Sequence, residues 1–100
     1  MKRILWWLLA GTRGGGTRAR IILFLRERPA NANQIANALS LDYKTVRYHL
    51  NILVNNRVLE DVGQGYGKSY FLSSEMEESF DTFSEIWDKI GKKQLKREED

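Results

Sequence analysis

One predicted helix near the middle of the chain carries the side chains best suited to a chemical task. Over residues 43–55, about 100° per residue places two cations, an aromatic ring and two amides on one face. These side chains are Lys44, Arg47, Tyr48, Asn51 and Asn55. The helix contains no Asp or Glu, whereas an ordinary solvent-exposed face usually mixes acids with bases. Arginine and lysine reach guanine edges or phosphates, asparagine pairs with adenine, and tyrosine contacts phosphate or thymine methyl. The pattern predicts a surface that reads the major groove of double-stranded DNA, the alternative being a merely solvated face.

Two neighbouring segments extend this predicted DNA surface. Tyr43 and Thr45, at the start of the helix, are placed for phosphate or base contact. In residues 63–68, glycines alternate with three polar side chains. Those side chains are Gln64, Tyr66 and Lys68. Glycines let a loop approach a backbone closely, so we expect this segment to contact the DNA backbone or minor groove. The simpler alternative is a turn without function.

The elements around these residues follow the order of a winged helix-turn-helix. A helix over 17–28 stops at Pro29, and Asn31 with Gln34 has the form of a capping box for the next helix. Asp42 is the expected N-cap of the helix over 43–55. Strand patterns over 58–62 and 68–72 predict a β-hairpin, the wing.

The predicted recognition helix also has an apolar stripe opposite its polar face. Val46, Leu50 and Leu53 fall within about 40° of one another and are expected in the core. His49 is expected at the edge of that core, a role that we favour over a pH switch.

The two ends of the chain carry apolar patterns that exceed the needs of a three-helix domain. Trp6 and Trp7, side by side in a predicted helix over 1–10, cannot both face one small core. A second helix over 74–90 has an apolar residue at alternating intervals of four and three, with Ile86 widening the seam. We predict that both helices form a symmetric homodimer interface, the alternative being that the seam packs on its own domain. The interface residues are Trp6, Trp7, Phe80, Phe83, Trp87 and Ile90.

Length and composition limit the other possibilities. One hundred residues form one small domain, here residues 1–91, followed by a disordered charged tail over 92–100. The chain has no cysteine and one histidine, so we expect no thiolate metal site, no catalytic triad, no cofactor and no enzyme activity. The first ten residues begin like a signal peptide, but their apolar run is far shorter than the roughly twenty residues that span a membrane. We therefore expect a cytoplasmic protein without a membrane partner.

The charge of the chain is divided between its two parts. Residues 1–72 hold eleven Lys/Arg against four Asp/Glu, whereas residues 73–100 hold five against nine. A basic body with an acidic end suggests a polyanion as partner of the body alone.

In that basic body, the stretch from Gly11 to Gly16 resembles a phosphate-binding loop but lacks its lysine, so we expect a hinge. A weaker hypothesis is that backbone N–H groups ahead of Thr17, with Arg13 and Arg18, hold a phosphate.

Residues 17–72 resemble the winged-helix domain of ArsR-type transcriptional regulators, and the whole chain is similar to small archaeal members. The stretches that carry the resemblance are Thr17-Arg18-Ala19-Arg20-Ile21-Ile22, Gln34-Ile35-Ala36-Asn37-Ala38-Leu39, Thr45-Val46-Arg47-Tyr48-His49-Leu50 and the wing. The resemblance implies a homodimer that binds operator DNA with residues 43–55 in the major groove. Ser40 stands where the family often has glycine, which bears on the turn. Metal-sensing members use cysteines or His/Asp clusters, so metal sensing is not carried over. The alternative function is a winged-helix module that binds a protein without specific DNA binding.

Overall fold

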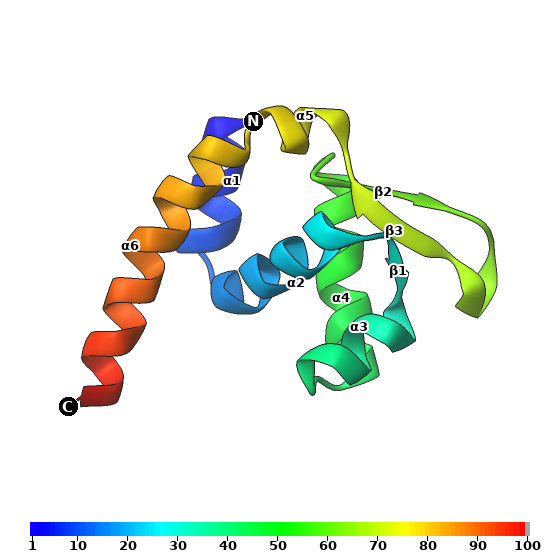
Figure 1. Ribbon diagram of the computed structural model, residues 1–100, viewed down its shortest axis with the longest axis horizontal. Coiled ribbons are helices and arrows are strands. Elements are labelled where there is room, and N and C mark those ends of the chain that lie inside the picture. The colour runs from blue at the N-terminus through cyan, green and yellow to red at the C-terminus, as the bar shows by residue number, and fades with distance from the viewer. Residues whose placement is uncertain (100) are drawn as a thin grey trace.

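Helices make up most of the chain in the computed structural model, which describes the backbone of residues 1–99 and the side chains of residues 1–91 (Figure 1). The elements are α1 Lys2–Ala10, α2 Gly15–Glu27, β1 Ala30–Asn31, α3 Ala32–Leu39, α4 Tyr43–Asn55, β2 Leu59–Val62, the 3-10 turn η1 Gly65–Gly67, β3 Ser69–Leu72, α5 Ser74–Glu78 and α6 Phe80–Glu99. This confirms the predicted fold class, a mostly helical winged helix-turn-helix with additional terminal helices. Within the described part of the chain, no helix is both long and apolar enough to cross a bilayer.

Helices α3 and α4 begin at the caps that the sequence predicts. The side chain of Asn31 accepts a hydrogen bond from the backbone N–H of Gln34 at 2.8 Å, and the Gln34 side chain accepts one from the N–H of Asn31 at 2.9 Å. Asp42 Oδ2 accepts from the N–H of Thr45 at 3.2 Å. Between the two helices Ser40 adopts a left-handed conformation with φ of 55°, the conformation for which glycine is usually chosen. The tight turn between the helices is thus kept although the glycine is absent.

The predicted hairpin is part of a larger sheet. Strands β2 and β3 pair antiparallel, and β1 adds a third strand on the other side of β3 through the pairs Ala30↔Tyr70 and Asn31↔Ser69. The sequence did not predict β1, because two residues are too few to show an alternating pattern. Only their pairing with β3 makes them a strand.

The core forms where the predicted stripe of α4 meets the other helices. Val46, Leu50 and Leu53 are completely buried, as expected, together with Ile21 of α2 and Ile35 of α3. Burying one such aliphatic side chain stabilises a fold by about 1.5–3 kcal/mol. The polar face of α4 therefore has its orientation set by the opposite, buried face.

The C-terminal region differs in detail from the predicted single helix. Helix α5, capped by Ser73 whose Oγ accepts from the N–H of Met76 at 3.1 Å, ends before Ser79, and α6 then runs to Glu99 rather than stopping near Ile90. Gly91 costs a helix only about 1 kcal/mol, and the residues after it are mostly strong helix formers. The side chains of the predicted tail over 92–100 and all of Asp100 lie outside the described residues.

Helices α1 and α6 lie side by side, and they bury much of the predicted seam within the chain (Figure 1). Phe83 is 1% exposed, and Met76 and Ile86 are completely buried. For these residues the alternative holds, in which the seam packs on its own domain, because they have no exposed surface with which to contact a partner. Trp7 is 56% exposed, whereas Trp6 is half-buried with Lys89 Nζ lying 5.1 Å from the centre of its ring.

Candidate nucleic-acid interface

The outer face of α4 is exposed over most of its length. Tyr48 is 62% exposed, and Lys44, Thr45, Asn51 and Asn55 are exposed as well. Because the helix contains no acid, this face presents hydrogen-bond donors and a positive charge without a carboxylate of its own. Such a face suits the edges of bases and the phosphates beside them.

Arg47 is the one residue among Lys44, Arg47, Tyr48 and Asn51 of α4 whose side chain is partly covered. Its Nη1 donates to the hydroxyl of Tyr43, one helical turn earlier, at 3.2 Å, and its Nε is buried without a partner among the described residues. The hydrogen bond with Tyr43, and secondly the electrostatic attraction of the phenol group of Tyr70, hold the pKa of Arg47 above its usual value. The guanidinium is charged and held along the helix, with a buried N–H still free to donate.

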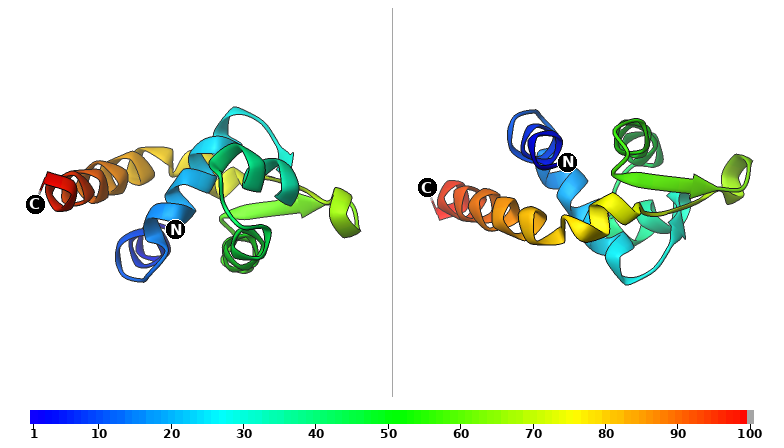
Figure 2. Two further views of the ribbon diagram at one scale, coloured as in Figure 1. Left: turned by 90° about the horizontal axis from the view of Figure 1, so that it is seen from below. Right: turned by 90° about the horizontal axis from the view of Figure 1, so that it is seen from above.

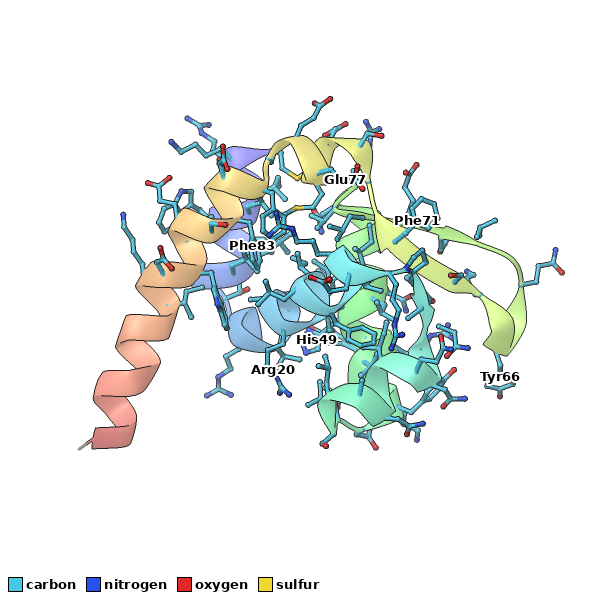
Figure 3. All side chains as sticks on the ribbon, in the orientation of Figure 1. Arg20, His49, Tyr66, Phe71, Glu77 and Phe83 are labelled. Atoms are coloured by element: carbon cyan, nitrogen blue, oxygen red, sulfur yellow. The ribbon has the colours of Figure 1, made fainter. Side chains whose placement is uncertain are left out.

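The tip of the wing lies beside the start of α4. Tyr66 is 78% exposed, and its ring centre is 6.3 Å from that of Tyr43, the partner of Arg47. Figure 3 shows Tyr66 at the far end of the hairpin. Gly63 and Gly65 have positive φ angles of 96° and 62°, so the tip uses backbone conformations that other residues rarely adopt. The wing and the recognition helix therefore present one continuous surface, a contact that the sequence did not reveal.

Lys68 is less free than its position in the wing suggests. Its Nζ lies 3.4 Å from Asp61 Oδ2, and both side chains are about one-third exposed. An exposed ion pair is worth only about 0–1 kcal/mol, so a phosphate competes with it at little cost. Among the predicted wing contacts, exposed Gln64 and Tyr66 are free of such pairing, and Lys68 has a carboxylate beside it.

Arg18 is a structural residue that sequence reasoning placed wrongly. It is 3% exposed; its Nε donates to the carbonyl of Leu8 at 3.0 Å, and its Nη2 donates to the carbonyl of Arg13 at 2.8 Å and to the hydroxyl of Thr12. Its Nη1 lies 3.4 Å from Nδ1 of His49 on α4. Helix α2 also begins at Gly15 rather than Thr17. The hypothesis that Arg18 holds a phosphate ahead of Thr17 is therefore wrong, because its donors already bind the chain. The name "Arg18 latch" is used below for these contacts.

His49 lies at the edge of the core, as predicted, and is 6% exposed. Burial, and secondly the nearby Arg18, lower its pKa below the ordinary value of a histidine. The imidazole is therefore neutral near pH 7 and can accept a hydrogen bond from Arg18.

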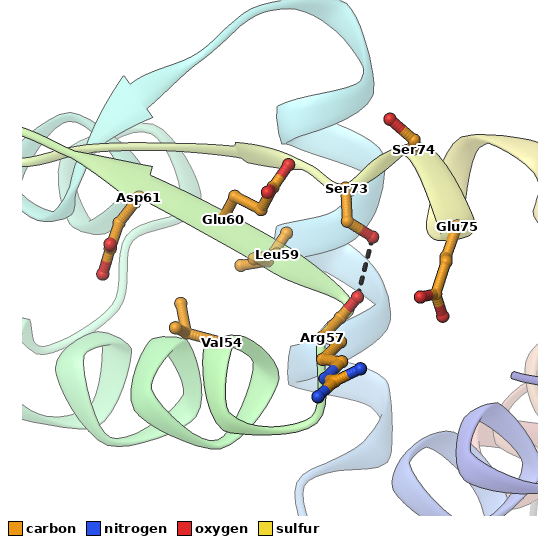
Figure 4. A pocket seen from close by; sticks show the side chains of 8 residues that line it. All are labelled: Val54, Arg57, Leu59, Glu60, Asp61, Ser73, Ser74 and Glu75. Carbon is orange, nitrogen blue, oxygen red and sulfur yellow. Dashed lines mark hydrogen bonds between the residues drawn. The ribbon is translucent and has the colours of Figure 1, made fainter.

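A groove behind the wing has the opposite electrostatic character. It lies between the end of α4, strand β2 and the start of α5, has a volume of about 450 Å³, and is lined in part by Glu60, Asp61 and Glu75 (Figure 4). In it, Ser73 Oγ donates to the carbonyl of Arg57 at 2.7 Å. Three acids repel a phosphate backbone, so this side of the wing is unsuited to contact with DNA. Within residues 1–91, no three His, Asp or Glu side chains come together as a metal site would require.

The order of the elements and the exposed outer face of α4 define a winged helix-turn-helix protein. Residues 15–61 match the family model described as "Bacterial regulatory protein, arsR family". This match, from the start of α2 into β2, confirms the resemblance drawn from the sequence: residues 15–61 are similar to the winged-helix domain of ArsR-family regulators. Such a family and fold are those of regulators, which are not enzymes.

Solved structures with the same fold span nearly the whole chain. The AntR antimony-specific transcriptional repressor has a TM-score of 0.65 at 19% identity, covering 97% of this chain and 78% of its own. YodB from B. subtilis has a TM-score of 0.67 at 22% identity, covering 87% of both chains. A probable transcriptional regulator from Pseudomonas aeruginosa has a TM-score of 0.70 at 16% identity, covering 96% of this chain and 75% of its own. At these identities the likeness is one of fold. No curated protein sequence matches the chain.

Proposed function

We propose that the protein is a homodimeric, sequence-specific DNA-binding transcriptional regulator. In the complex α4 lies in the major groove, and the wing tip contacts the backbone or the minor groove. The observation that carries this proposal is the exposed, acid-free outer face of α4, where Lys44, Tyr48 and Asn51 project from a helix whose other side is buried. We place the protein in the cytoplasm together with its DNA, and the proposal does not include sensing of a metal.

Selection of bound DNA from a random pool, followed by footprinting, tests the proposal directly. The expected result is a palindrome whose half-sites lie one helical turn, about 10 base pairs, apart. Affinity should also fall steeply as the logarithm of the salt concentration rises, because phosphate contacts release counterions. An unselective pool, or binding of a protein partner with little salt dependence, would favour the alternative of a protein-interaction module.

The dimer is proposed to form through α1 and the flank of α6. Ile4 and Trp7 of α1 are 38% and 56% exposed, and half-buried Trp6, Trp87 and Ile90 adjoin the core beneath. Large exposed apolar side chains on one helix are costly in water and are relieved by pairing with a second copy. Two chains joined in this way carry two recognition helices for successive major grooves.

Sedimentation equilibrium of Trp7→Lys tests this interface. The substitution should shift the chain toward monomer, because a cation replaces the largest exposed apolar side chain of α1. Val62→Lys is the matched control, since Val62 is 62% exposed but lies on the wing. If Trp7→Lys stays dimeric, the interface is elsewhere, and a monomeric wild type removes the dimer from the proposal.

A further inference from the structure

We propose that the loop between α1 and α2, residues 11–14, is a second DNA-backbone site in which Arg13 contacts a phosphate on the side of α4 opposite the wing. The inference rests on the proposed function, since it needs α4 in the major groove. It assigns a function to Arg13, an exposed cation that belongs to neither the recognition helix nor the wing.

The first observation is a groove between α1 and α4 with a volume of about 370 Å³. Residues of the loop and α1 line one side of it, and residues of the outer face of α4 line the other. They include Trp7, Thr12, Arg13, Tyr48, Asn55 and Asn56. None of the described residues that line the groove is Asp or Glu. Arg13 is exposed, so its guanidinium stands at the border of the predicted DNA surface.

The second observation is that the loop is held firmly in register with α4. The Arg18 latch binds the carbonyl of Arg13 and the hydroxyl of Thr12 from beneath. Gly14 has φ of 85°, and a Cβ at this position would lie 2.6 Å from Cε1 of His49. Only glycine lets the loop pass this close to the recognition helix. The backbone that carries Arg13 therefore has a fixed position relative to α4. Little conformational entropy is lost in the loop when Arg13 binds a phosphate.

The third observation concerns charge. Arg18, 3% exposed, forms no ion pair with any carboxylate of the described residues, and its hydrogen bonds go to carbonyls, a hydroxyl and an imidazole. A buried cation without a counterion gives its surroundings a positive potential. Exposed Arg13 adds a second positive charge at the mouth of the groove. An anion is the complementary ligand, and DNA brings a row of phosphates to this face.

The arrangement of the elements gives the phosphate its place. In both views of Figure 2, α1 and α4 lie along the same edge of the molecule, and the tip of the wing projects at one end, so that α4 lies between α1 and the tip. The major groove is about 12 Å wide and has a sugar-phosphate backbone on each edge. With α4 in that groove, the wing adjoins one backbone and the Arg13 loop adjoins the other.

Titration of the full-length protein with its selected operator at several salt concentrations tests the inference. Arg13→Gln should reduce the slope of log affinity against log salt by about 0.9, the contribution of one phosphate contact. Affinity for the operator and for a scrambled duplex should fall by the same factor, because phosphate contacts carry no sequence information. Arg3→Gln is the matched control, because Arg3 is an exposed arginine near the other end of α1, about 12 Å from the start of the loop by helix rise.

A second variant tests the positioning of Arg13. Gly14→Ala keeps Arg13 but forces the loop away from His49, so the same loss of slope is expected from a chain whose circular dichroism shows it folded. An Arg13→Gln slope equal to that of wild type, with operator binding retained, overturns the inference and leaves the proposed function standing. A wild type that binds no DNA at all removes the proposed function itself.

Discussion

The Arg18 latch should be a large contributor to the stability of the fold, and Arg18→Met tests this. Methionine keeps a long apolar stem but removes the donors to the carbonyls of Leu8 and Arg13 and to the hydroxyl of Thr12. A buried acceptor left without a donor costs about 1–3 kcal/mol. The Leu8 carbonyl bears most of this cost, because its hydrogen bond with Arg18 is buried and its other donor, the Thr12 hydroxyl, lies at the long distance of 3.5 Å, whereas water can reach exposed Arg13.

The removed cation offsets part of that cost. Burial lowers the pKa of Arg18, which shows that the folded chain holds this charge at the expense of its solvation. Setting the lost hydrogen bonds against the relieved desolvation leaves a net loss of about 2–4 kcal/mol. In a domain of this size, that loss lowers the melting temperature by about 10–30 °C.

Urea denaturation followed by circular dichroism, at one fixed protein concentration, measures the free energy of unfolding. Arg20→Met is the matched control, because Arg20 lies on the same helix and its Nη2 donates to the carbonyl of Leu39 at 2.9 Å in an exposed position. That variant should lose less than about 1 kcal/mol. If Arg18→Met is as stable as wild type, the desolvation of the buried charge costs as much free energy as the hydrogen bonds of Arg18 contribute. The reasoning about the Arg18 latch then fails.

Three further outcomes are expected. Because folding lowers the pKa of His49, the unfolded chain takes up a proton at a higher pH than the folded chain does. The free energy of unfolding should therefore decrease as the pH drops below about 6.5, by at most about 1.4 kcal/mol per pH unit. In urea melts at several pH values, His49→Gln should flatten that slope, and an unchanged slope would assign it to other groups. Asp42→Ala should cost about 0.5–2 kcal/mol through loss of the α4 cap, measured by thermal melting, with Asp88→Ala on α6 as an exposed control. Arg47→Ala should weaken operator binding by about 1–3 kcal/mol in a titration while the protein stays folded and keeps the oligomeric state of the wild type; unchanged affinity would remove Arg47 from the proposed DNA-reading surface.

The helix-turn-helix could be predicted from the sequence because its signals are local. Asn31 and Gln34, three residues apart, specify the start of α3, and Asp42 specifies the start of α4. The spacing of Val46, Leu50 and Leu53 states which side of α4 is buried, so the polar side is known as well. The capping residue and the apolar spacing were therefore sufficient to predict the polar face of the recognition helix.

The dimer seam shows where such local reasoning ends. A heptad pattern states that one side of a helix is buried, but it does not state against what. The structure buries Phe83 of α6 within the chain and leaves Trp7 of α1 exposed, although both are large aromatic side chains of predicted interface helices that pack on each other. The choice depends on how α1 and α6 cross, which neither segment encodes alone.

Periodicity, capping residues and charge distribution therefore determined the class of fold and the exposed polar face of α4 that we propose for DNA, since each acts within a few residues of chain. Tertiary structure alone decided the two-residue strand β1, the contact of Tyr66 with Tyr43, and the Arg18 latch. The pair of Arg18 and His49 is separated by 31 residues, and no short-range pattern links such positions. Their meeting depends on the packing of whole helices, which only the folded chain specifies.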